Sequence, residues 1–343
     1  MTGWVPDVLP GYWQRTIPLG ADPAGEGEIV ATLVRRGEPA GAQHAVLAVH
    51  GYTDYFFHTE LADRFADRGF AFYALDLQKC GRSRRDGQTP HFITDLAHYD
   101  TELERALSVV REPGPTGRRP KVLVYGHSSG GLIVPLWLDR LRRRDPAAHA
   151  GVGGLVLNSP FLDLHGPAVL RHSATAAVIA GLSRVRSKGV VRGPSEGGYG
   201  TTLHRDYHGE FDYNLQWKPL GGFPITLGWL HAIRRGQARL HRGLDVGVPN
   251  LILRSDHTVA ETTDPESMQS GDAVLDVNQI AKWAGCIGNR TTIVPVPDAK
   301  HDVFLSLNRA RRTAYRELDL WLDHYLRNET TADSPGSASS GKG

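Results

Sequence analysis

Residues 121–138, KVLVYGHSSGGLIVPLWL, decide the fold. An apolar run at 121–125 leads directly into GHSSG at 126–130, and an apolar helical pattern follows. In this strand–turn–helix context, a G-x-S-x-G sequence forms a nucleophile elbow, a sharp turn that exposes a serine hydroxyl. The flanking glycines let neighbouring backbones approach without Cβ clashes. Ser128 is therefore the predicted nucleophile, and the alternative is a serine that caps a buried helix.

The same motif predicts where an oxyanion would be held. The backbone amide of Ser129 lies at the N-terminus of the following helix, where the helix dipole is positive. A second donor is expected from the loop after the strand at 45–50, where the Tyr52 amide follows His50 and Gly51. We interpret His50 as a structural, hydrogen-bonding residue of that turn.

The rest of the chain alternates between short β-branched runs and longer helical patterns, which indicates an α/β fold with a mostly parallel sheet. Strands are expected at 28–35, 45–50, 70–75, 121–125, 152–157, 248–254 and 291–296. Apolar residues at helical spacing predict helices around 57–65, 96–110, 226–241 and 314–325. Pro135, inside the helix pattern after the elbow, is expected to kink it.

Residues 160–245 interrupt this alternation, and strand-like sequence resumes at 248. We therefore interpret them as a cap inserted into one core. The predicted divisions are a first core part at 1–159, the cap at 160–245, a second core part at 246–327 and a tail at 328–343. The tail lacks apolar residues and is predicted to be disordered.

Composition limits the classes of function. The 343 residues suit one large domain, or one domain with an insertion, and 40% hydrophobic with 22% charged residues is typical of a soluble globular chain. A net charge of +2 argues against a nucleic-acid partner. No run approaches the roughly 18 apolar residues of a membrane span, and the N-terminus does not resemble a signal peptide. Two cysteines exclude a disulfide scaffold. A cytoplasmic protein without stable membrane insertion is expected.

Together these motifs resemble the α/β-hydrolases of the monoacylglycerol-lipase and lysophospholipase type, a group also described as serine-aminopeptidase-like. The resemblance rests on the HG dipeptide at 50–51, DLQKCGRS at 76–83, GHSSGG at 126–131 and PDAKHD at 297–302. It implies an α/β-hydrolase fold with the cap inserted between strands six and seven of the family's sheet. It also implies triad residues in the order Ser, acid, His.

One position departs from that family. A small or flexible residue usually follows HG, whereas this chain has Tyr52. The aromatic ring either lines an acyl pocket or adds a hydroxyl to the oxyanion site. The HGYTDY version of the motif also resembles bacterial lactonases that open the macrocyclic lactone zearalenone.

A serine nucleophile needs a base. Beyond the strand at 248–254 the chain has His257, His301 and His324. His324 lies in an amphipathic helical pattern, where a packed or solvated role is expected. His301 follows the last predicted strand in a loop and is therefore the predicted base.

The acid that orients the base has three alternatives. Asp272 is favoured because the DAVLD pattern at 272–276 suits an acid followed by a helix start. Asp256 follows its strand directly, and Asp276 remains a third alternative. A longer loop before Asp272 is tolerable because each doubling of loop length costs only about 0.6 kcal/mol.

These residues predict a serine hydrolase of carboxylic esters or lactones that needs no metal or cofactor. The expected substrate is a small apolar ester or lactone, with a zearalenone-type macrolactone among the alternatives, and a homo-oligomer is compatible with the sequence. Aromatic residues of the cap would bind it: Tyr213, Trp217 and Trp229. A monoacylglycerol lipase or lysophospholipase and an acyltransferase are the alternative enzymes. A non-catalytic binding protein is the alternative from another class.

Overall fold

The computed structural model describes residues 3–39, 41–114, 117–195, 198–262 and 264–332. Its centre is a nine-stranded sheet. The strands are β1 (Val5–Pro6), β2 (Tyr12–Ala21), β3 (Glu28–Arg36), β4 (His44–Val49), β5 (Phe70–Asp76), β6 (Lys121–His127), β7 (Val152–Asn158), β10 (Asn250–Ser255) and β11 (Thr291–Val296). Their order is β1-β2-β3-β5-β4-β6-β7-β10-β11. The pairs from β5 to β11 are parallel, and β1, β2 and β3 pair antiparallel at one edge.

The seven predicted strands are confirmed close to their predicted bounds, and β2 is a strand that the sequence analysis missed. Its sequence, YWQRTIPLGA, mixes polar residues and a proline and has no continuous apolar run. The strand forms because it pairs along its length with β3, from Tyr12 opposite Arg36 to Ala21 opposite Glu28. Pairing with a neighbour therefore overrides a weak local pattern.

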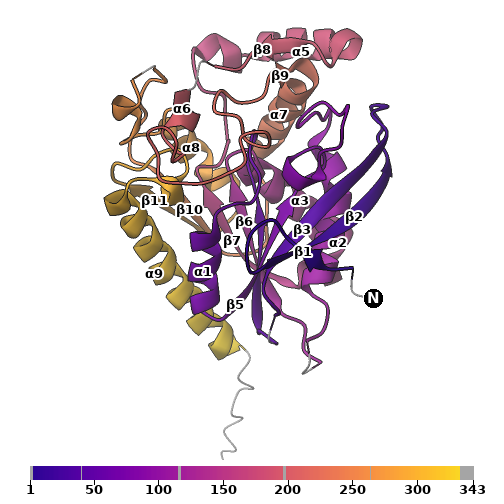
Figure 1. The fold of residues 1–343 in the computed structure, drawn as a ribbon, viewed down its shortest axis with the longest axis vertical. Coiled ribbons are helices and arrows are strands. Elements are labelled where there is room, and N and C mark those ends of the chain that lie inside the picture. The colour runs from indigo at the N-terminus through magenta and orange to yellow at the C-terminus, as the bar shows by residue number, and fades with distance from the viewer. Residues whose placement is uncertain (1–2, 40, 115–116, 196–197, 263, 333–343) are drawn as a thin grey trace, which may run out of the picture.

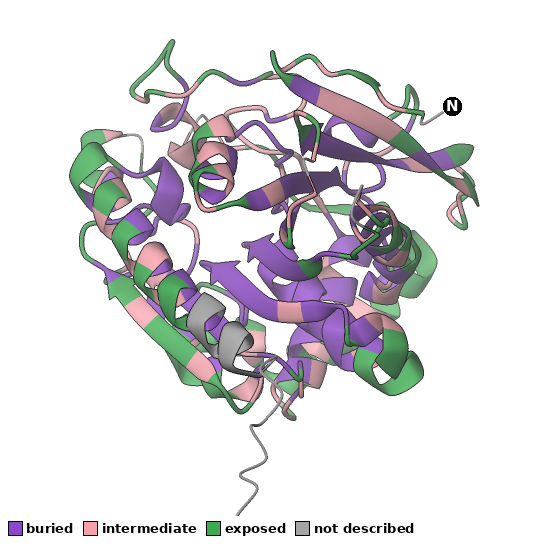
Figure 2. Ribbon diagram, turned by 90° about the horizontal axis from the view of Figure 1, so that it is seen from below, coloured by how far each residue is buried: buried purple, intermediate pink, exposed green. Residues whose placement is uncertain are grey.

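Helices cover both faces of the sheet (Figure 1). They are α1 (Thr59–Asp67), α2 (Asp100–Val110), α3 (Gly130–Arg144), α4 (Pro146–His149), α8 (Val277–Trp283) and α9 (Asn308–Ala332). One core cluster packs α1 and α9 on one face, around Phe65, and the other packs α2 and α3 on the opposite face, around Trp137. In Figure 2 the central strands of the sheet are buried, and the outer sides of the helices are exposed. No described helix is long and apolar enough to cross a membrane.

Between β7 and β10 the chain leaves the sheet. This segment forms α5 (Ser173–Arg186), β8 (Val190–Arg192), α6 (Gly198–Thr201), β9 (Ile225–Thr226) and α7 (Leu227–Leu240). The predicted helix at 226–241 is confirmed as α7, and it packs into the main core through Trp229 and Ile233. The part before α7 lies at the top of Figure 1. We refer to residues 160–245 as the cap, as in the sequence analysis.

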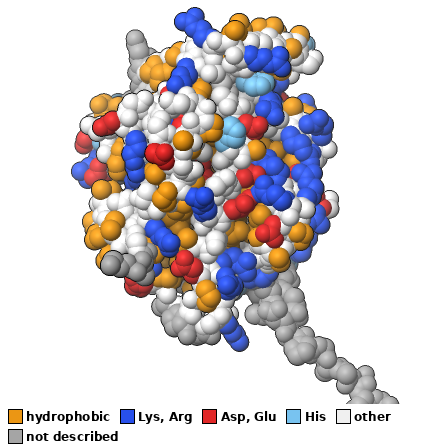
Figure 3. All heavy atoms as spheres, turned by 90° about the vertical axis from the view of Figure 1, so that its right-hand side faces the viewer, with side chains coloured by type: hydrophobic (Ala, Val, Ile, Leu, Met, Phe, Trp, Pro, Cys, Tyr) orange, Lys and Arg blue, Asp and Glu red, His pale blue; other side chains and the backbone are white. Residues whose placement is uncertain are grey.

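Helix α5 was not expected because its sequence, SATAAVIAGLSRVR, has no single apolar stripe. Val178, Leu182 and Val185 are exposed on it. Figure 3 shows hydrophobic side chains at the top of the molecule, where α5 lies.

Two details differ from, or extend, the predicted pattern. The chain remains helical in α9 through Ala332, past the predicted start of the tail at 328. The remainder of the predicted tail, 333–343, lies outside the described residues. Helix α3 runs through Pro135 without ending there.

Candidate active site

The elbow lies where β6 ends at His127 and α3 begins at Gly130. Ser128, between them, has a φ of 51°, in the left-handed region that non-glycine residues rarely adopt. Its N–H donates to the Asn158 carbonyl at 3.0 Å, and its own carbonyl accepts the Phe161 N–H at 2.9 Å. These two bonds hold a strained turn in place, as is typical of functional sites.

The two glycines of the motif are needed for close packing. A Cβ atom at Gly126 would lie 2.8 Å from the Gly130 carbonyl oxygen, and a Cβ at Gly130 would lie 2.5 Å from the His50 carbonyl oxygen. Both distances are shorter than real Cβ contacts, so only glycine fits at either position. The start of α3 is thereby packed against the loop that follows β4.

The predicted oxyanion donors are the amides of Tyr52 and Ser129. Gly51 approaches the nucleophile so closely that a Cβ there would be 2.9 Å from the Ser128 Cβ. Tyr52 follows Gly51 directly in the chain, and Ser129 follows Ser128. Neither amide donates a hydrogen bond to another described residue. Both N–H groups are therefore available to a developing negative charge.

His50 uses both of its ring nitrogens within the turn. Its Nδ1 donates to the Gly51 carbonyl at 2.7 Å, and its Nε2 accepts the Leu77 N–H at 3.0 Å. This agrees with the structural role expected for His50.

The predicted base and the favoured acid are in contact. His301 Nδ1 lies 3.0 Å from Asp272 Oδ2, and both side chains are buried. The other oxygen of Asp272 accepts the N–H groups of Val274, at 2.8 Å, and Leu275, at 2.7 Å. The carboxylate is thus fixed by three donors, and it holds the proton of the imidazole on Nδ1.

This arrangement leaves the other nitrogen of the base free to act. His301 Nε2 is buried and has no hydrogen-bond partner among the residues that the structure describes. The His301 ring centroid is 5.1 Å from that of His127, the residue that precedes Ser128. The structure therefore brings His301 to the elbow with a lone pair on Nε2.

The alternative acids lie elsewhere. Asp256 is partly exposed and contacts His257 Nδ1 at 2.7 Å and the Asp298 N–H at 3.1 Å. Asp276 accepts the Asn278 N–H at the start of α8. Of the three carboxylates that the sequence left open, Asp272 is the one bonded to His301.

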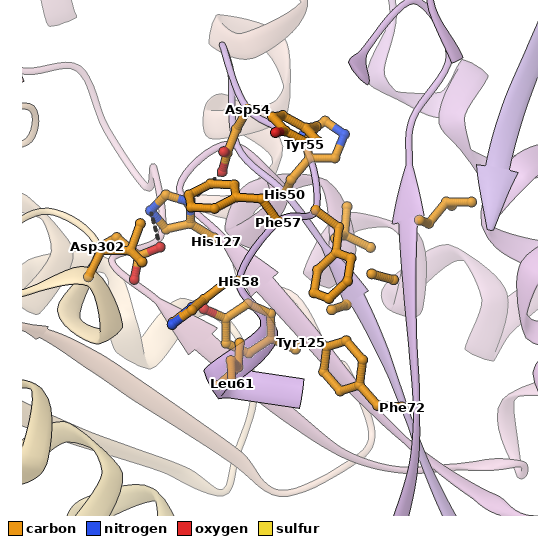
Figure 4. Close-up of a pocket in the computed structure, with 16 residues that line it drawn as sticks. His50, Asp54, Tyr55, Phe57, His58, Leu61, Phe72, Tyr125, His127 and Asp302 are labelled. Carbon is orange, nitrogen blue, oxygen red and sulfur yellow. Dashed lines mark hydrogen bonds and ion pairs between the residues drawn. The ribbon is translucent and has the colours of Figure 1, made fainter. Parts of the chain in front are cut away.

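A buried cluster of charged groups surrounds the residue before the nucleophile (Figure 4). His127 Nδ1 lies 3.2 Å from Asp54 Oδ2, and His127 Nε2 lies 3.8 Å from Asp302 Oδ2. Burial opposes a charged His127, but the carboxylates of Asp302 and Asp54 outweigh it and raise the pKa of this histidine. Lys218 of the cap contacts the other oxygen of Asp54 at 2.7 Å. Although burial favours the protonated acid, Lys218 and His127 hold the pKa of Asp54 well below its usual range.

The sequence analysis did not single out Asp54, Lys218 or Asp302. Asp54 and Asp302 lie within the quoted HGYTD and PDAKHD motifs, and Asp302 directly follows His301. The feature that could have identified both aspartates is their position next to the motif residues in the sequence. Nothing in the sequence pointed to Lys218, because its partner is 164 residues away along the chain.

The three aromatic residues proposed for substrate binding fall into two groups. The ring of Trp229, in α7, lies 4.2 Å from that of Tyr52, which follows Gly51. Trp217 packs at 5.1 Å against Tyr55, and Tyr213 packs at 5.0 Å against Phe57. The latter two belong to a separate small apolar cluster between the cap and the loop after β4.

The Tyr52 side chain does not face the oxyanion site with its hydroxyl. Its Oη donates to the Pro224 carbonyl at 2.7 Å, and its ring lies between His91, at 4.7 Å, and Trp229. Burial raises the pKa of this tyrosine, so it remains a neutral donor. The hydroxyl is thus bonded to the cap, and the expectation that the ring lines an acyl pocket stays a prediction.

A nine-stranded, mostly parallel sheet with a strand–serine–helix elbow and an insertion after β7 defines an α/β-hydrolase. Residues 40–266 match the model of the family described as serine aminopeptidase, S33, and the chain belongs to this family of hydrolases. A search of curated proteins finds no similar sequence.

Solved structures share the fold at low sequence identity. A soluble variant of monoglyceride lipase from Saccharomyces cerevisiae, in complex with a substrate analog, is 17% identical, with 94% of each chain covered and a TM-score of 0.61. A thermostable carboxyl esterase from Bacillus coagulans, in complex with glycerol, is 13% identical, with 91% of this chain and 99% of that chain covered and a TM-score of 0.61. A putative aryl esterase from Burkholderia cenocepacia is 17% identical, with 91% and 100% covered and a TM-score of 0.52.

Proposed function

We propose that this protein hydrolyses carboxylic esters or lactones through Ser128, His301 and Asp272. One observation carries the proposal. The buried hydrogen bond from His301 Nδ1 to Asp272 leaves His301 Nε2 without a described partner, next to a strained serine turn. A base oriented in this way and a nucleophile on an elbow are the elements that acyl transfer through serine needs.

In this mechanism His301 Nε2 takes the proton of the Ser128 hydroxyl while the serine oxygen bonds to the carbonyl carbon. The carbonyl electrons move to its oxygen, which accepts the amide N–H groups of Tyr52 and Ser129. His301 then donates its proton to the leaving alkoxide, and the acyl-enzyme remains. Water repeats these steps, with His301 as base, and releases the acid. With a lactone, the leaving hydroxyl stays attached to the acyl chain.

We extend the proposal to the substrate class. The Tyr52 ring packs against Trp229 at 4.2 Å, and Tyr52 follows Gly51, which lies against Ser128. An aromatic ester or lactone can pack on such rings, and each good aromatic pair adds about 0.5–1.5 kcal/mol beyond the buried area. A resorcylic macrolactone such as zearalenone is therefore preferred over a long-chain monoacylglycerol. The cap at 160–245, as predicted from the sequence, would cover this substrate.

The test is a substrate panel on purified protein, made of an aryl ester, zearalenone, a long-chain monoacylglycerol and an amino-acid arylamide. Ser128→Ala should lower turnover of every substrate by at least about three decades and abolish labelling by a fluorophosphonate. Ser267→Ala, at an exposed serine, is the matched control and should behave like wild type.

Retained labelling of Ser128→Ala would show that another serine is the nucleophile. Cleavage of the arylamide alone would replace the esterase proposal with a peptidase. Fast monoacylglycerol hydrolysis without lactone opening would favour the alternative that the protein is a lipase.

A further inference from the structure

The loop that carries the Tyr52 amide is bonded residue by residue to one segment of the cap, residues 214–224, which we call the strap. Tyr52 Oη donates to the Pro224 carbonyl at 2.7 Å. The Phe223 N–H donates to Thr53 Oγ1 at 2.9 Å. The side chains of Tyr52 and Thr53 therefore both form hydrogen bonds with the strap.

The next two side chains do the same. Lys218 Nζ contacts Asp54 Oδ1 at 2.7 Å, and the Asn214 N–H donates to the Tyr55 hydroxyl at 2.7 Å. Four consecutive residues, 52–55, thus use their polar atoms on the strap. This stretch begins at Tyr52, the position at which a small or flexible residue usually follows HG in the family.

The backbone of this loop is strained. Thr53 has a φ of 51°, which is rare for a β-branched residue. Such a conformation persists only where the surroundings impose it, because it costs of order 1–3 kcal/mol. At Thr53 the strap provides that restraint through the hydrogen bond that the Phe223 N–H donates to Thr53 Oγ1.

Asp54 links the strap to the elbow. Its carboxylate contacts Lys218 through Oδ1. Its Oδ2 lies 3.2 Å from His127 Nδ1 and accepts the Gly51 N–H at 3.4 Å. Gly51 lies against Ser128, and His127 precedes it. One buried carboxylate therefore joins the cap, the oxyanion loop and the strand that carries the nucleophile.

The far end of the loop is held by the core instead. The Phe56 N–H donates to Asp76 Oδ1 at 2.8 Å, and Arg82 donates to the Phe56 carbonyl at 2.9 Å. The segment from 52 to 55 thus lies between residues that the core holds and the strap, and it contacts the strap at each of its four residues.

From this geometry we propose that the strap is a positioning element for the oxyanion site, with Lys218 and Thr53 as the positioning residues through which it holds the Tyr52 amide. The inference rests on the proposed function, because it concerns the same reaction. Displacing one oxyanion donor by about 1 Å can cost as much as 10²-fold in rate, so the effect is expected in the chemical step.

The experiment compares Lys218→Met, Lys218→Arg and Thr53→Val with wild type on one aryl ester. Lys218→Met removes the charge that faces Asp54, and Thr53→Val removes only the hydroxyl and keeps the β-branched shape. Arg205→Met is the matched control, because Arg205 forms an exposed cap ion pair with Asp212 at 3.0 Å, outside the strap. Thermal melting of each variant shows whether it is folded.

The proposal predicts that kcat falls by about tenfold or more in Lys218→Met and Thr53→Val while KM changes by less than about threefold. Lys218→Arg should recover most of the lost rate, and Arg205→Met should keep the wild-type rate.

A second readout isolates the oxyanion. An aryl trifluoromethyl ketone is attacked by the Ser128 oxygen, the serine proton passes to His301, and the former carbonyl oxygen becomes an alkoxide in the oxyanion site. Its inhibition constant should rise in proportion to the loss of kcat/KM across the same variants.

An increase of KM alone, or unchanged inhibition by the ketone in a slowed variant, would overturn the proposal and make the strap a substrate-binding or purely structural element. If Lys218→Met does not fold, Thr53→Val decides by the same criteria. Activity that survives Ser128→Ala would instead overturn the proposed function, so the two failures are distinguishable.

Discussion

The carboxylate of Asp272 is bonded on both of its oxygen atoms. Oδ1 accepts two backbone N–H groups of the turn that follows it, and Oδ2 faces His301 Nδ1. An asparagine at this position would keep its carbonyl oxygen on the turn and place its NH₂ group against the imidazole. His301 would then have to accept on Nδ1 and carry its proton on Nε2, where it could not act as a base.

We therefore expect Asp272→Asn to lower kcat by about three to four decades without unfolding the protein. Asp256→Asn is the control at the competing carboxylate and should change kcat by less than about twofold, because Asp256 contacts His257 rather than His301. Steady-state kinetics on one ester measure both. The opposite ranking of the two variants would assign the orienting role to Asp256.

At the scale of elements, α2 places a carboxylic acid under the end of β5. Glu102 is fully buried, and its two oxygens accept the backbone and side-chain N–H groups of Gln78, at 2.9 and 3.2 Å. Burial outweighs these two hydrogen bonds and raises the pKa of Glu102 from 4.5 to about 8. The folded protein therefore holds a proton at neutral pH that the unfolded chain releases.

Because the folded pKa lies above the unfolded one, this contribution to stability is complete below pH 4.5 and is lost as the pH rises to about 8. The loss amounts to at most about 1.4 kcal/mol per pH unit. Glu102→Gln should remove this slope. The free energy of unfolding of the variant should therefore rise relative to that of the wild type as the pH increases from about 5 to about 8. Urea unfolding across this interval measures it. Glu28→Gln, at an exposed site of β3, should retain the wild-type slope, and parallel curves for Glu102→Gln and wild type would contradict the assignment.

At the scale of the whole molecule, the aromatic rings around the loop after β4 come from parts that are distant in sequence. Tyr52 comes from the loop after β4, and Trp229 comes from α7, within the insertion after β7. Tyr213 and Trp217 come from the same insertion but pack around Tyr55 and Phe57. The aromatic residues of the cap are thus divided between Trp229, which packs on Tyr52, and a small apolar cluster around Tyr55 and Phe57.

This division predicts that Trp229→Ala raises KM for an aryl ester or zearalenone by about tenfold, and raises KM for a short aliphatic ester much less, because aromatic stacking is what it removes. Trp321→Ala, on α9 and stacked on Tyr325, is the control. The two KM values should be measured for each variant at one pH. Equal increases for aromatic and aliphatic substrates would show that Trp229 supports the fold rather than selecting the substrate.

Local sequence determined the parts of this protein that depend on contiguous residues. The buried strands were predictable from apolar runs, and the elbow at 126–130 was predictable because a glycine–serine turn between a strand and a helix is a local shape. The order of Ser128, Asp272 and His301 followed from the resemblance to a family. The strand β2 and the helix α5 were missed because neither has a clear apolar period.

Tertiary structure alone decided which groups meet. It placed Asp272 rather than Asp256 on His301, turned the Tyr52 hydroxyl toward Pro224, and brought Lys218 to Asp54 across 164 residues of sequence. The physical reason is that periodicity reports which face of an element is buried, whereas an ion pair or hydrogen bond depends on how separate elements pack. Contacts between residues far apart in the chain leave no trace in the local pattern, and the four bonds between residues 52–55 and the strap are contacts of this kind.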